Sequence, residues 1–401
     1  MKEGREGGFF EVYMKAIGRT PIPEKFHRWS ALSLVASVLE NRVVVMHHKA
    51  ALNPNLYVLL VGPSGCGKGT AMDFAMARWH ALYGGEGRLL RGGLTKQRLL
   101  DVLGGRTTSV ANGQAKVEAA VANPHPWIVS PELYNALGSG GPVAEAFIAN
   151  LTDLYTSSVV PITEGTRRWG DVTISGHCIN WLAGSTSQWL RRSLSPDAIL
   201  SGFFGRVVAI EGSYAGKWAA SQYPANYDDL IDQLHVHLTR MSVLSGECIV
   251  TSEAQDVREQ WLENREVPDD EFLRPAYQRD DDLLLKLAVV LCAGESDELI
   301  IHRRHVARAR TLVAEARASL PMLVNLAHTT SQSDAMGAVI TLMKRSGYVT
   351  HAHLLKVMSN RGVTADMLRK YITTLEQADR ILVHKTTRGG AYEWKAESKA
   401  F

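Results

Sequence analysis

Cysteine is scarce in this chain of 401 residues. The four cysteines are Cys66, Cys178, Cys248 and Cys292. None of them shares the short spacing of a paired zinc or redox motif, which excludes a zinc-binding cysteine cluster and a disulfide framework. Such usage is typical of a protein that works in a reducing compartment.

Long apolar runs and an excess of one charge are also absent. The most apolar segment, 283–293, contains Lys286 and is too short to cross a bilayer. Four of the first six residues are charged, and this stretch does not form a signal peptide. The net charge of +3 is too small to indicate a class of partner. We therefore expect a cytoplasmic protein that does not contact a membrane.

One stretch near residue 60 combines three features of an anion-binding site. Tyr57–Val61 is an unbroken apolar run, which predicts a buried strand, and apolar residues at helical spacing follow from Ala71. Between them lies a Gly-x-x-x-x-Gly-Lys sequence that ends at Lys68. Glycines let successive backbone N–H groups turn toward phosphate oxygens, and the lysine adds a positive charge. The alternative is a glycine-rich turn with a chance lysine, but the flanking strand and helix favour phosphate binding.

The predicted phosphate-binding loop departs from the usual pattern at one position. Its residues are Gly62, Pro63, Ser64, Gly65, Cys66, Gly67, Lys68, Gly69 and Thr70. A Ser or Thr that binds Mg²⁺ usually follows the lysine, but here Gly69 stands there and Thr70 comes one place later. We expect ATP and Mg²⁺ as cofactors, with Thr70 as the candidate metal ligand. The Lys-Gly-Thr ending is also found in nucleotide kinases.

A carboxylate follows the second apolar strand. Trp127, Ile128 and Val129 predict a buried strand, and Glu132 lies just beyond it. A P-loop ATPase carries a carboxylate at the tip of the strand beside the loop strand, where it holds the metal or activates water. We therefore expect Glu132 to be catalytic. The alternative is a surface glutamate at a strand end.

Three further segments carry candidate residues of the same site. The strand that starts at Cys178 ends in Ser185 and Thr186, whose hydroxyl groups are suited to positioning the attacking water. Arg206 precedes the apolar strand 207–210, where ring ATPases place an arginine that reaches a neighbour's nucleotide. The alternative for Arg206 is an ordinary salt bridge. Arg279 begins a helical region and is a candidate to reach back to the nucleotide.

A glycine-containing hairpin is predicted between 159 and 175. Its turn carries Arg167, Arg168 and Trp169. Two cations and an aromatic ring are suited to contact a nucleic-acid backbone and stack on a base. A solvated hairpin tip is the alternative.

The C-terminal residues predict a winged helix, that is, helix-turn-helix followed by a hairpin. Residues 331–401 carry 11 Lys and Arg but only 6 Asp and Glu, an excess larger than the net charge of the chain. The basic residues expected on its DNA-facing surface are Arg361, Arg369, Lys370, Lys385 and Arg388. Winged helices also dock proteins, so that alternative stays open.

These patterns divide the chain into five parts. We expect an N-terminal helical segment packed on the core, an α/β ATPase core, a helical lid with its connector, a polar linker and the winged helix. The ranges are 1–50, 51–212, 213–325, 326–334 and 335–401, respectively.

The order of the motifs resembles a family of phage and prophage P-loop ATPases that are described as DnaB-like or replicative helicases. The resemblance rests on Pro23-Glu24-x-Phe26-x-x-Trp29, Asn55–Gly62, the loop, Ser130–Leu133, Leu182–Thr186, Gly202–Arg206 and Arg279-x6-Lys286. The order of domains is also similar to the AAA+ plan of minichromosome-maintenance helicases. The resemblance implies an AAA+ core in which Glu132 is the Walker B glutamate, Ser185 or Thr186 is sensor 1, Arg206 is the arginine finger and Arg279 is sensor 2. Ser130 and Pro131 stand where an aspartate normally precedes that glutamate.

The leading hypothesis is a ring-forming ATPase, expected to be a hexamer, that translocates on DNA during phage or mobile-element replication. Single-stranded DNA would lie in the pore, and duplex DNA would contact the winged helix. The alternative is a replication initiator or helicase loader that uses ATP as an assembly switch and does not unwind. A nucleotide kinase is a third hypothesis, but the sequence has no acceptor-site signature.

Overall fold

The computed structural model divides the chain into two compact units, residues 1–324 and 325–401. It describes residues 7–84, 89–92, 95–111, 114–119, 122–137, 142–156, 162–166, 170–193, 202–214, 222–270, 273–359, 363–386 and 389–395.

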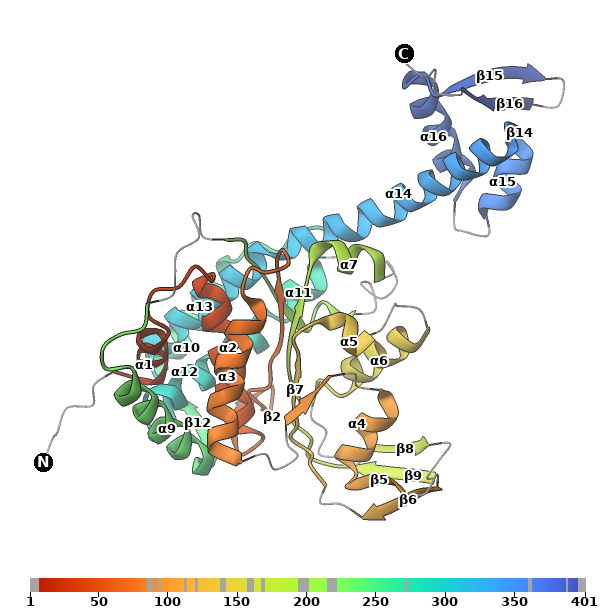
Figure 1. Cartoon of the computed structure of the whole chain (residues 1–401). Helices are drawn as coiled ribbons and strands as arrows, with labels where there is room; N and C mark the ends of the chain where they lie inside the picture. Colours follow the sequence, from red (N-terminus) through yellow and green to blue (C-terminus); the bar gives the residue numbers. More distant parts are fainter. Residues whose placement is uncertain are drawn as a thin grey trace, which may run out of the picture. The chain divides into compact units, whose positions relative to one another are not determined.

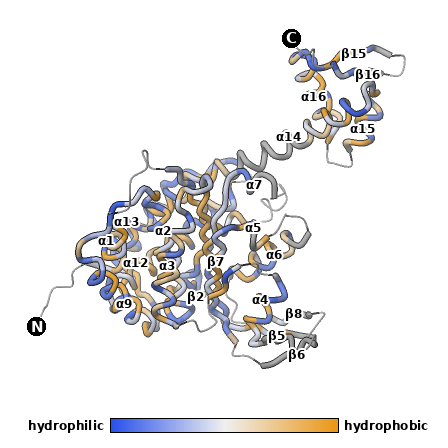
Figure 2. Tube along the Cα trace, in the orientation of Figure 1, coloured by the Kyte–Doolittle hydropathy of each residue, from blue (hydrophilic) through white to orange (hydrophobic). Residues whose placement is uncertain are grey.

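A five-stranded parallel sheet organises the first unit (Figure 1). Its order is β11 (Val207–Glu211), β3 (Tyr57–Val61), β10 (Asn180–Ser185), β7 (Trp127–Ser130) and β4 (Leu89–Arg91). The three strands β3, β7 and β10 are buried at every position. Helices on both faces of a parallel sheet favour such continuous apolar strands, and Figure 2 shows hydrophobic residues along them. The expectation of an α/β fold with a parallel sheet is confirmed.

Helices from both ends of this unit pack against one another and against the sheet. α2 (Glu24–Leu39) contacts β3, β10 and β11, and α3 (Lys68–Tyr83) packs on α2. α1 (Phe9–Ile17) packs on α9 (Tyr227–Val243), while α10 (Ser252–Asn264) and α12 (Asp280–Glu295) pack on α13 (Arg303–Ala318). α12 is buried almost throughout, because its apolar residues occupy every face.

A second sheet joins segments that the sequence analysis assigned to different domains. Its order is β13 (Ile300–Ile301), β12 (Gly246–Val250), β1 (Val43–His47) and β2 (Ala50–Leu52). β1 therefore pairs with a strand some 200 positions later, with Val45 opposite Cys248. The predicted boundaries at 50 and 212 fall inside one compact unit. The two residues of β13, which are too few for a strand to be predicted, join this sheet because β12 supplies a partner.

Two antiparallel hairpins lie beside α4 (Lys96–Leu103) (Figure 1). One joins β5 (Arg106–Ala111) to β6 (Gln114–Ala119), in a stretch with no clear sequence pattern. The other joins β8 (Ile162–Thr166) to β9 (Gly170–Ile174), so the predicted hairpin is present. Other helices in the described part of this unit are α5 (Leu133–Leu137), α6 (Pro142–Asp153), α7 (Ser187–Ser193) and α11 (Arg274–Gln278).

The second unit combines helices with a three-stranded antiparallel sheet. Its described elements are most of α14 (Leu320–Ser346), β14 (Tyr348–Thr350), α15 (His351–Ser359), α16 (Ala365–Gln377), β15 (Ile381–Thr386) and β16 (Gly389–Trp394). The strands are arranged β14–β16–β15. Met343, Leu354, Leu368 and Tyr392 are among the buried residues of its separate core.

The predicted polar linker 326–334 is helical instead, since it lies within α14. It contains neither proline nor glycine, so nothing in its backbone chemistry ends a helix there. Across the described ranges, no helix has both the length and the apolar content that are needed to cross a bilayer.

Candidate functional site

The glycine loop lies at the carboxyl end of β3 and leads directly into α3. Gly65 and Gly67 have φ angles of +82° and +85°, in the left-handed region that favours glycine. Gly67 is the N-cap of α3, and no side chain caps this helix end. The first N–H groups of a helix have no intrahelical acceptor, and the helix dipole makes this end positive. The loop therefore ends at a helix terminus that is suited to bind an anion.

Close packing also requires glycine in the loop. A Cβ atom at Gly67 would lie 2.4 Å from Cγ1 of Ile22, and one at Gly65 would lie 2.7 Å from the hydroxyl of Tyr214. The Tyr214 hydroxyl also donates to the carbonyl of Ser64 at 3.4 Å. Sequence reasoning missed Ile22 and Tyr214, because neither belongs to the loop motif. The Pro21-Ile22-Pro23 break before α2 was the only available signal for Ile22.

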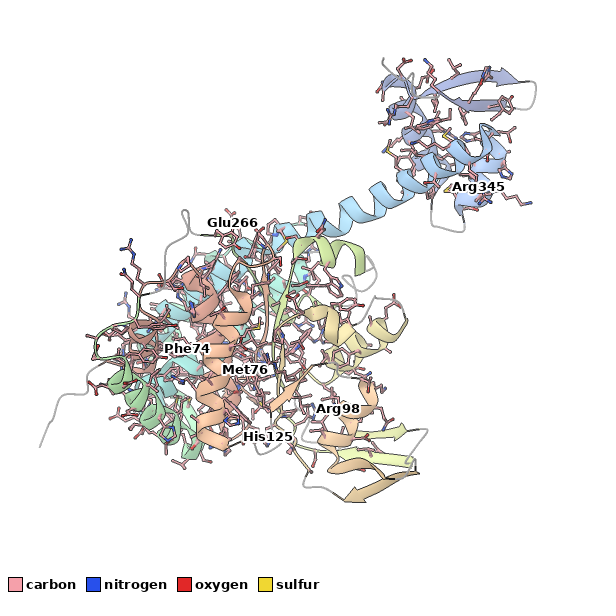
Figure 3. The ribbon with its side chains drawn as sticks, viewed as in Figure 1. Phe74, Met76, Arg98, His125, Glu266 and Arg345 are labelled. Carbon is pink, nitrogen blue, oxygen red and sulfur yellow. The ribbon has the colours of Figure 1, made fainter. Side chains whose placement is uncertain are left out.

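Lys68 is the first residue of α3 and is only 4% exposed. Its ammonium donates to the carbonyl oxygens of Gly62 at 2.8 Å and Pro63 at 2.9 Å. Within the described residues, no carboxylate forms a salt bridge with it. Among the described residues, the ammonium is therefore surrounded by neutral acceptors of the loop. A phosphate oxygen carries a negative charge and would be a stronger hydrogen-bond partner for it. Beyond this residue, Phe74 and Met76 follow along α3 (Figure 3).

Ser185 and Thr186 lie directly beside the loop. Ser185 is opposite Val61 in the β10–β3 pair, and its carbonyl accepts from the N–H of Gly62 at 3.1 Å. The hydroxyl of Ser185 donates to the carbonyl of Thr186 at 3.3 Å. The hydroxyl of Thr186 accepts from the N–H of Trp189 at 3.1 Å. The tip of β10 is thus held in place by local hydrogen bonds next to the loop.

Glu132 lies at the same edge of the sheet, but one strand farther away than expected. β7 pairs with β10 and β4, and β10 separates it from the loop strand β3. The expectation that the carboxylate follows the strand beside the loop strand is therefore wrong, because hydrophobic patterns predict strands but not their order. Glu132 is exposed, two residues beyond the end of β7.

The two positions before Glu132 are used for packing. Ser130 is fully buried, and its hydroxyl accepts from the indole Nε1 of Trp181 at 3.2 Å. A Cβ atom at Gly184 would lie 2.4 Å from the carbonyl oxygen of Pro131, so β10 and the end of β7 approach closely. Ser130 therefore fills a structural role where an aspartate is usual.

Thr70 and Gly69 lie in the first turn of α3. Thr70 is exposed, and a Cβ atom at Gly69 would have no heavy atom within 4 Å. Steric constraints therefore do not require glycine at position 69. The displaced hydroxyl of Thr70 is the one that this turn offers to a metal ion, with Mg²⁺ as the expected ion.

Arg206 and Arg279 lie together at the opposite edge of the sheet. Arg206 precedes Val207, which is opposite Tyr57, the first residue of β3. Five residues of strand separate this edge from the loop, a distance of roughly 16 Å. Neither arginine is brought to the loop of its own chain, so the expectation that Arg279 reaches back to the nucleotide is wrong within a single chain.

The two guanidinium groups are near each other. Nη1 of Arg206 donates to the carbonyl of Gly202 at 2.9 Å, and Nη1 of Arg279 donates to that of Pro275 at 3.1 Å. Burial, aided by the positive charge of Arg279, lowers the pKa of Arg206 below its ordinary value. Among the described residues, Arg206 has no carboxylate in salt-bridge contact, so the salt bridge considered for it is not seen.

Asn55 and Lys286, two residues of the motifs on which the family resemblance rests, have a structural role. The ammonium of Lys286 donates to the side-chain oxygen of Asn55 at 2.7 Å and lies 3.9 Å from the ring centroid of Tyr155. Nδ2 of Asn55 donates to the carbonyl of Tyr155 at 2.8 Å. This contact ties α12 to the start of β3.

The predicted DNA-binding residues are described only in part. Arg369 and Lys370 are exposed on α16, and Arg369 lies 3.4 Å from Asp366. Lys385 lies in β15, but its side chain is outside the described part. Arg167, Arg168, Trp169, Arg361 and Arg388 lie outside the described residues.

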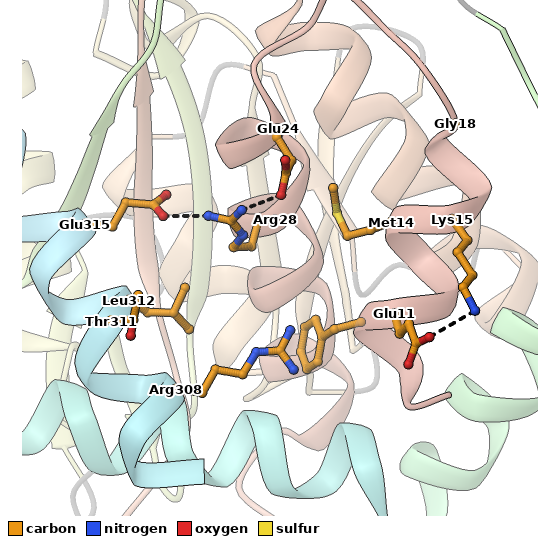
Figure 4. Close-up of a pocket in the computed structure, with 11 residues that line it drawn as sticks. Glu11, Met14, Lys15, Gly18, Glu24, Arg28, Arg308, Thr311, Leu312 and Glu315 are labelled. Atoms are coloured by element: carbon orange, nitrogen blue, oxygen red, sulfur yellow. Dashed lines mark hydrogen bonds and ion pairs between the residues drawn. The ribbon is translucent and has the colours of Figure 1, made fainter. Parts of the chain in front are cut away.

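A cavity of about 810 Å³ lies away from the loop, between α1, α2 and α13 (Figure 4). Arg28 lies between Glu24 and Glu315 there, at 2.5 Å and 2.6 Å. Paired charges of this kind stabilise helix contacts and do not by themselves indicate a ligand.

Comparison with known proteins adds no assignment. No protein-family model matches the sequence, and no curated protein matches it significantly.

Proposed function

We propose that this chain is a P-loop ATPase of the AAA+ type that binds ATP at the loop of 62–70. The observation that carries the proposal is the state of Lys68: among the described residues its buried ammonium is held by neutral atoms of the loop, two carbonyl oxygens and the sulfur of Cys66 at 3.7 Å, at the N-terminus of an uncapped helix. A triphosphate would accept hydrogen bonds from the loop N–H groups and from this ammonium. Such a cradle supplies positive charge where negative charge accumulates during phosphoryl transfer.

The other residues at the carboxyl edge take complementary roles in this proposal. The exposed carboxylate of Glu132 orients or activates the water that attacks the γ-phosphate. Ser185 and Thr186, beside the loop, position that water. Thr70 contributes a hydroxyl to the coordination of Mg²⁺, the ion that would neutralise the phosphate oxygens when bound.

Arg206 has a role only if subunits assemble. Because it lies at the edge of the sheet away from its own loop, it would complete the site of a neighbouring subunit. This arrangement favours a ring, with a hexamer as the proposed form, and places Arg279 beside Arg206 at the same subunit boundary.

The C-terminal unit supports a role on DNA. Two helices followed by an antiparallel hairpin have the element order of a winged helix. Arg369 and Lys370 give α16 an exposed positive pair, which suits contact with phosphates. We therefore propose an ATP-driven DNA helicase or translocase of phage or mobile-element replication, acting in the cytoplasm.

A second function is favoured by Ser130. Because Ser130 and Pro131 stand where an aspartate usually precedes the glutamate, and the buried Ser130 is hydrogen-bonded to Trp181, the site has fewer metal-binding carboxylates than a fast ATPase. A replication initiator or helicase loader needs ATP for assembly and does not need rapid turnover.

The test compares the full chain with Lys68→Ala and Glu132→Gln, and uses Lys15→Ala, at an exposed position of α1, as the matched control. We expect Lys68→Ala to lose ATP binding. Glu132→Gln should keep binding but lose hydrolysis by at least about 100-fold. ATPase rates with and without single-stranded DNA, together with strand displacement, separate the two functions. Retention of ATP binding by Lys68→Ala would contradict both.

A further inference from the structure

Two consecutive histidines meet at the turn between β1 and β2. His47 ends β1 and lies opposite Ala50, so His48 and Lys49 form the turn. Their φ angles are +46° and +63°, in the left-handed region where a two-residue turn favours asparagine or glycine. Consecutive side chains of a strand point to opposite faces. The turn instead brings the rings of His47 and His48 to 3.9 Å between centroids.

Carboxylates from the start of α12 face this pair. β1 packs on α12, whose first turn carries Asp281 and Asp282. Nε2 of His47 lies 3.4 Å from Oδ2 of Asp281 and 3.3 Å from Oδ1 of Asp282. Within the described ranges, the ligand atoms of His47, His48 and Asp281 all lie within 4.8 Å of one another, closely enough to hold a metal ion. Sequence spacing does not reveal this cluster, because the aspartates lie far along the chain from the histidines.

The cluster is buried on one side and open to solvent on the other. The side chains of His47 and Asp281 are 8% and 16% exposed, whereas that of Asp282 is 40% exposed. His48 is also exposed. An ion can therefore enter from solvent, and once bound it is partly shielded from water.

The donor atoms and their spacing suit Zn²⁺. Imidazole nitrogens and carboxylate oxygens are both zinc ligands, whereas Mg²⁺ and Ca²⁺ bind oxygen. Tetrahedral bonds of about 2.1 Å place neighbouring ligand atoms about 3.4 Å apart. The two distances from Nε2 of His47 already match this spacing. His48 lies on an exposed turn, so a rotation of its side chain can bring a ring nitrogen closer.

Arg258 of α10 already holds one of these carboxylates in place. It donates to both oxygens of Asp281, at 2.6 Å and 2.5 Å, and its Nη2 lies 3.1 Å from Nδ1 of His47. Arginine can only donate, so Nδ1 accepts and Nε2 carries the ring proton. A metal ion needs the lone pair of Nε2, so the proton must move to Nδ1 and Arg258 must release His47. Arg258 can still orient Asp281, and the two carboxylates leave one negative charge for a cation to balance.

We propose a Zn²⁺ site that joins the β1–β2 turn to the first turn of α12, with four ligands: His47, His48, Asp281 and Asp282. All four are provided by the protein, which is the arrangement of a structural zinc site. Zn²⁺ that binds only the folded chain stabilises it against unfolding. The site shares no residue with the ATP site of the proposed function and does not depend on it.

The test uses the full chain without a histidine tag, treated with EDTA and then titrated with Zn²⁺ in the absence of nucleotide. We expect one Zn²⁺ per chain by elemental analysis after gel filtration, and a higher melting temperature that EDTA lowers again. Co²⁺ in the same site should show the strong visible absorption of tetrahedral cobalt, which added Zn²⁺ removes. A chain that retains no Zn²⁺, or whose melting temperature Zn²⁺ does not raise, would overturn the proposal.

His48→Asn separates metal binding from folding. Asparagine suits the left-handed turn, so this variant should fold like the wild type, as circular dichroism checks, but bind Zn²⁺ at least about 10-fold more weakly by calorimetry. His80→Asn, at an exposed position of α3, is the matched control and should bind Zn²⁺ normally. Lys68→Ala, which should lose ATP, should keep Zn²⁺, so the outcome does not depend on the ATP site. Equal Zn²⁺ affinity of His48→Asn and the wild type would contradict the assigned ligands.

Discussion

The ammonium of Lys68 donates to the carbonyl oxygen of Gly62, six residues earlier, at 2.8 Å. This bond folds the glycine loop back on the residue that binds its phosphate in the proposed function. A nucleotide must therefore exchange two carbonyl acceptors for phosphate oxygens. In the proposed function, the stability of the free protein and its affinity for ATP are coupled through this one side chain.

Lys68→Met tests this coupling. Methionine keeps the length and apolar character of the side chain but leaves the carbonyls of Gly62 and Pro63 without their donor. We expect the free energy of unfolding to fall by about 1–3 kcal/mol. Added ATP should no longer raise the melting temperature, as measured by thermal unfolding. A variant that ATP stabilises as well as the wild type would contradict the role of Lys68.

Gly67→Ala tests the packing of the loop. The added Cβ would combine a left-handed backbone with a 2.4 Å approach to Ile22, so we expect both stability and ATP affinity to fall. The double variant Ile22→Ala/Gly67→Ala should regain part of the loss, since it removes the clash but not the backbone strain. Gly69→Ala, with open space around it, is the control and should bind ATP normally. Denaturant unfolding and nucleotide titration give both quantities.

Arg206 is tested by mixing subunits. Neither Arg206→Ala nor Lys68→Ala alone should hydrolyse ATP, because each lacks one half of the proposed shared site. Mixed rings should regain part of the activity, since some boundaries then join an intact loop to an intact Arg206. Steady-state ATPase assays over a range of mixing ratios measure this. If Arg206→Ala alone keeps full activity, a shared site is ruled out.

The burial of His27 should make the free energy of unfolding depend on pH. It is 3% exposed, its two ring nitrogens have no partner in the described part of the chain, and burial lowers its pKa to about 4. The unfolded chain takes up a proton near the ordinary pKa of 6.5, and the folded chain does so only near 4. Stability is therefore retained above pH 6.5 and falls as the pH drops toward 4, by about 3 kcal/mol. His27→Leu should remove this part of the acid loss, which urea unfolding at several pH values measures.

The sequence by itself determined the features that are continuous in the chain. The apolar run of β3, the glycines that follow and the helix from Lys68 lie within 27 residues, from Tyr57 to Tyr83, so local pattern and backbone chemistry suffice to predict them. The hairpin of β8 and β9 and the helices and strands of the C-terminal unit are local in the same sense.

Only the tertiary structure decided which distant segments meet. Strand order is a property of the whole sheet, so β10 was not expected between the loop strand and the strand before Glu132. Arg279 lies beside Arg206 because α11 packs at the amino edge. Val45 lies opposite Cys248 because β1 and β12 pair in one sheet. An apolar pattern shows that a helix or strand is buried, but it does not show which distant element packs against it. These contacts therefore depend on how the elements pack together.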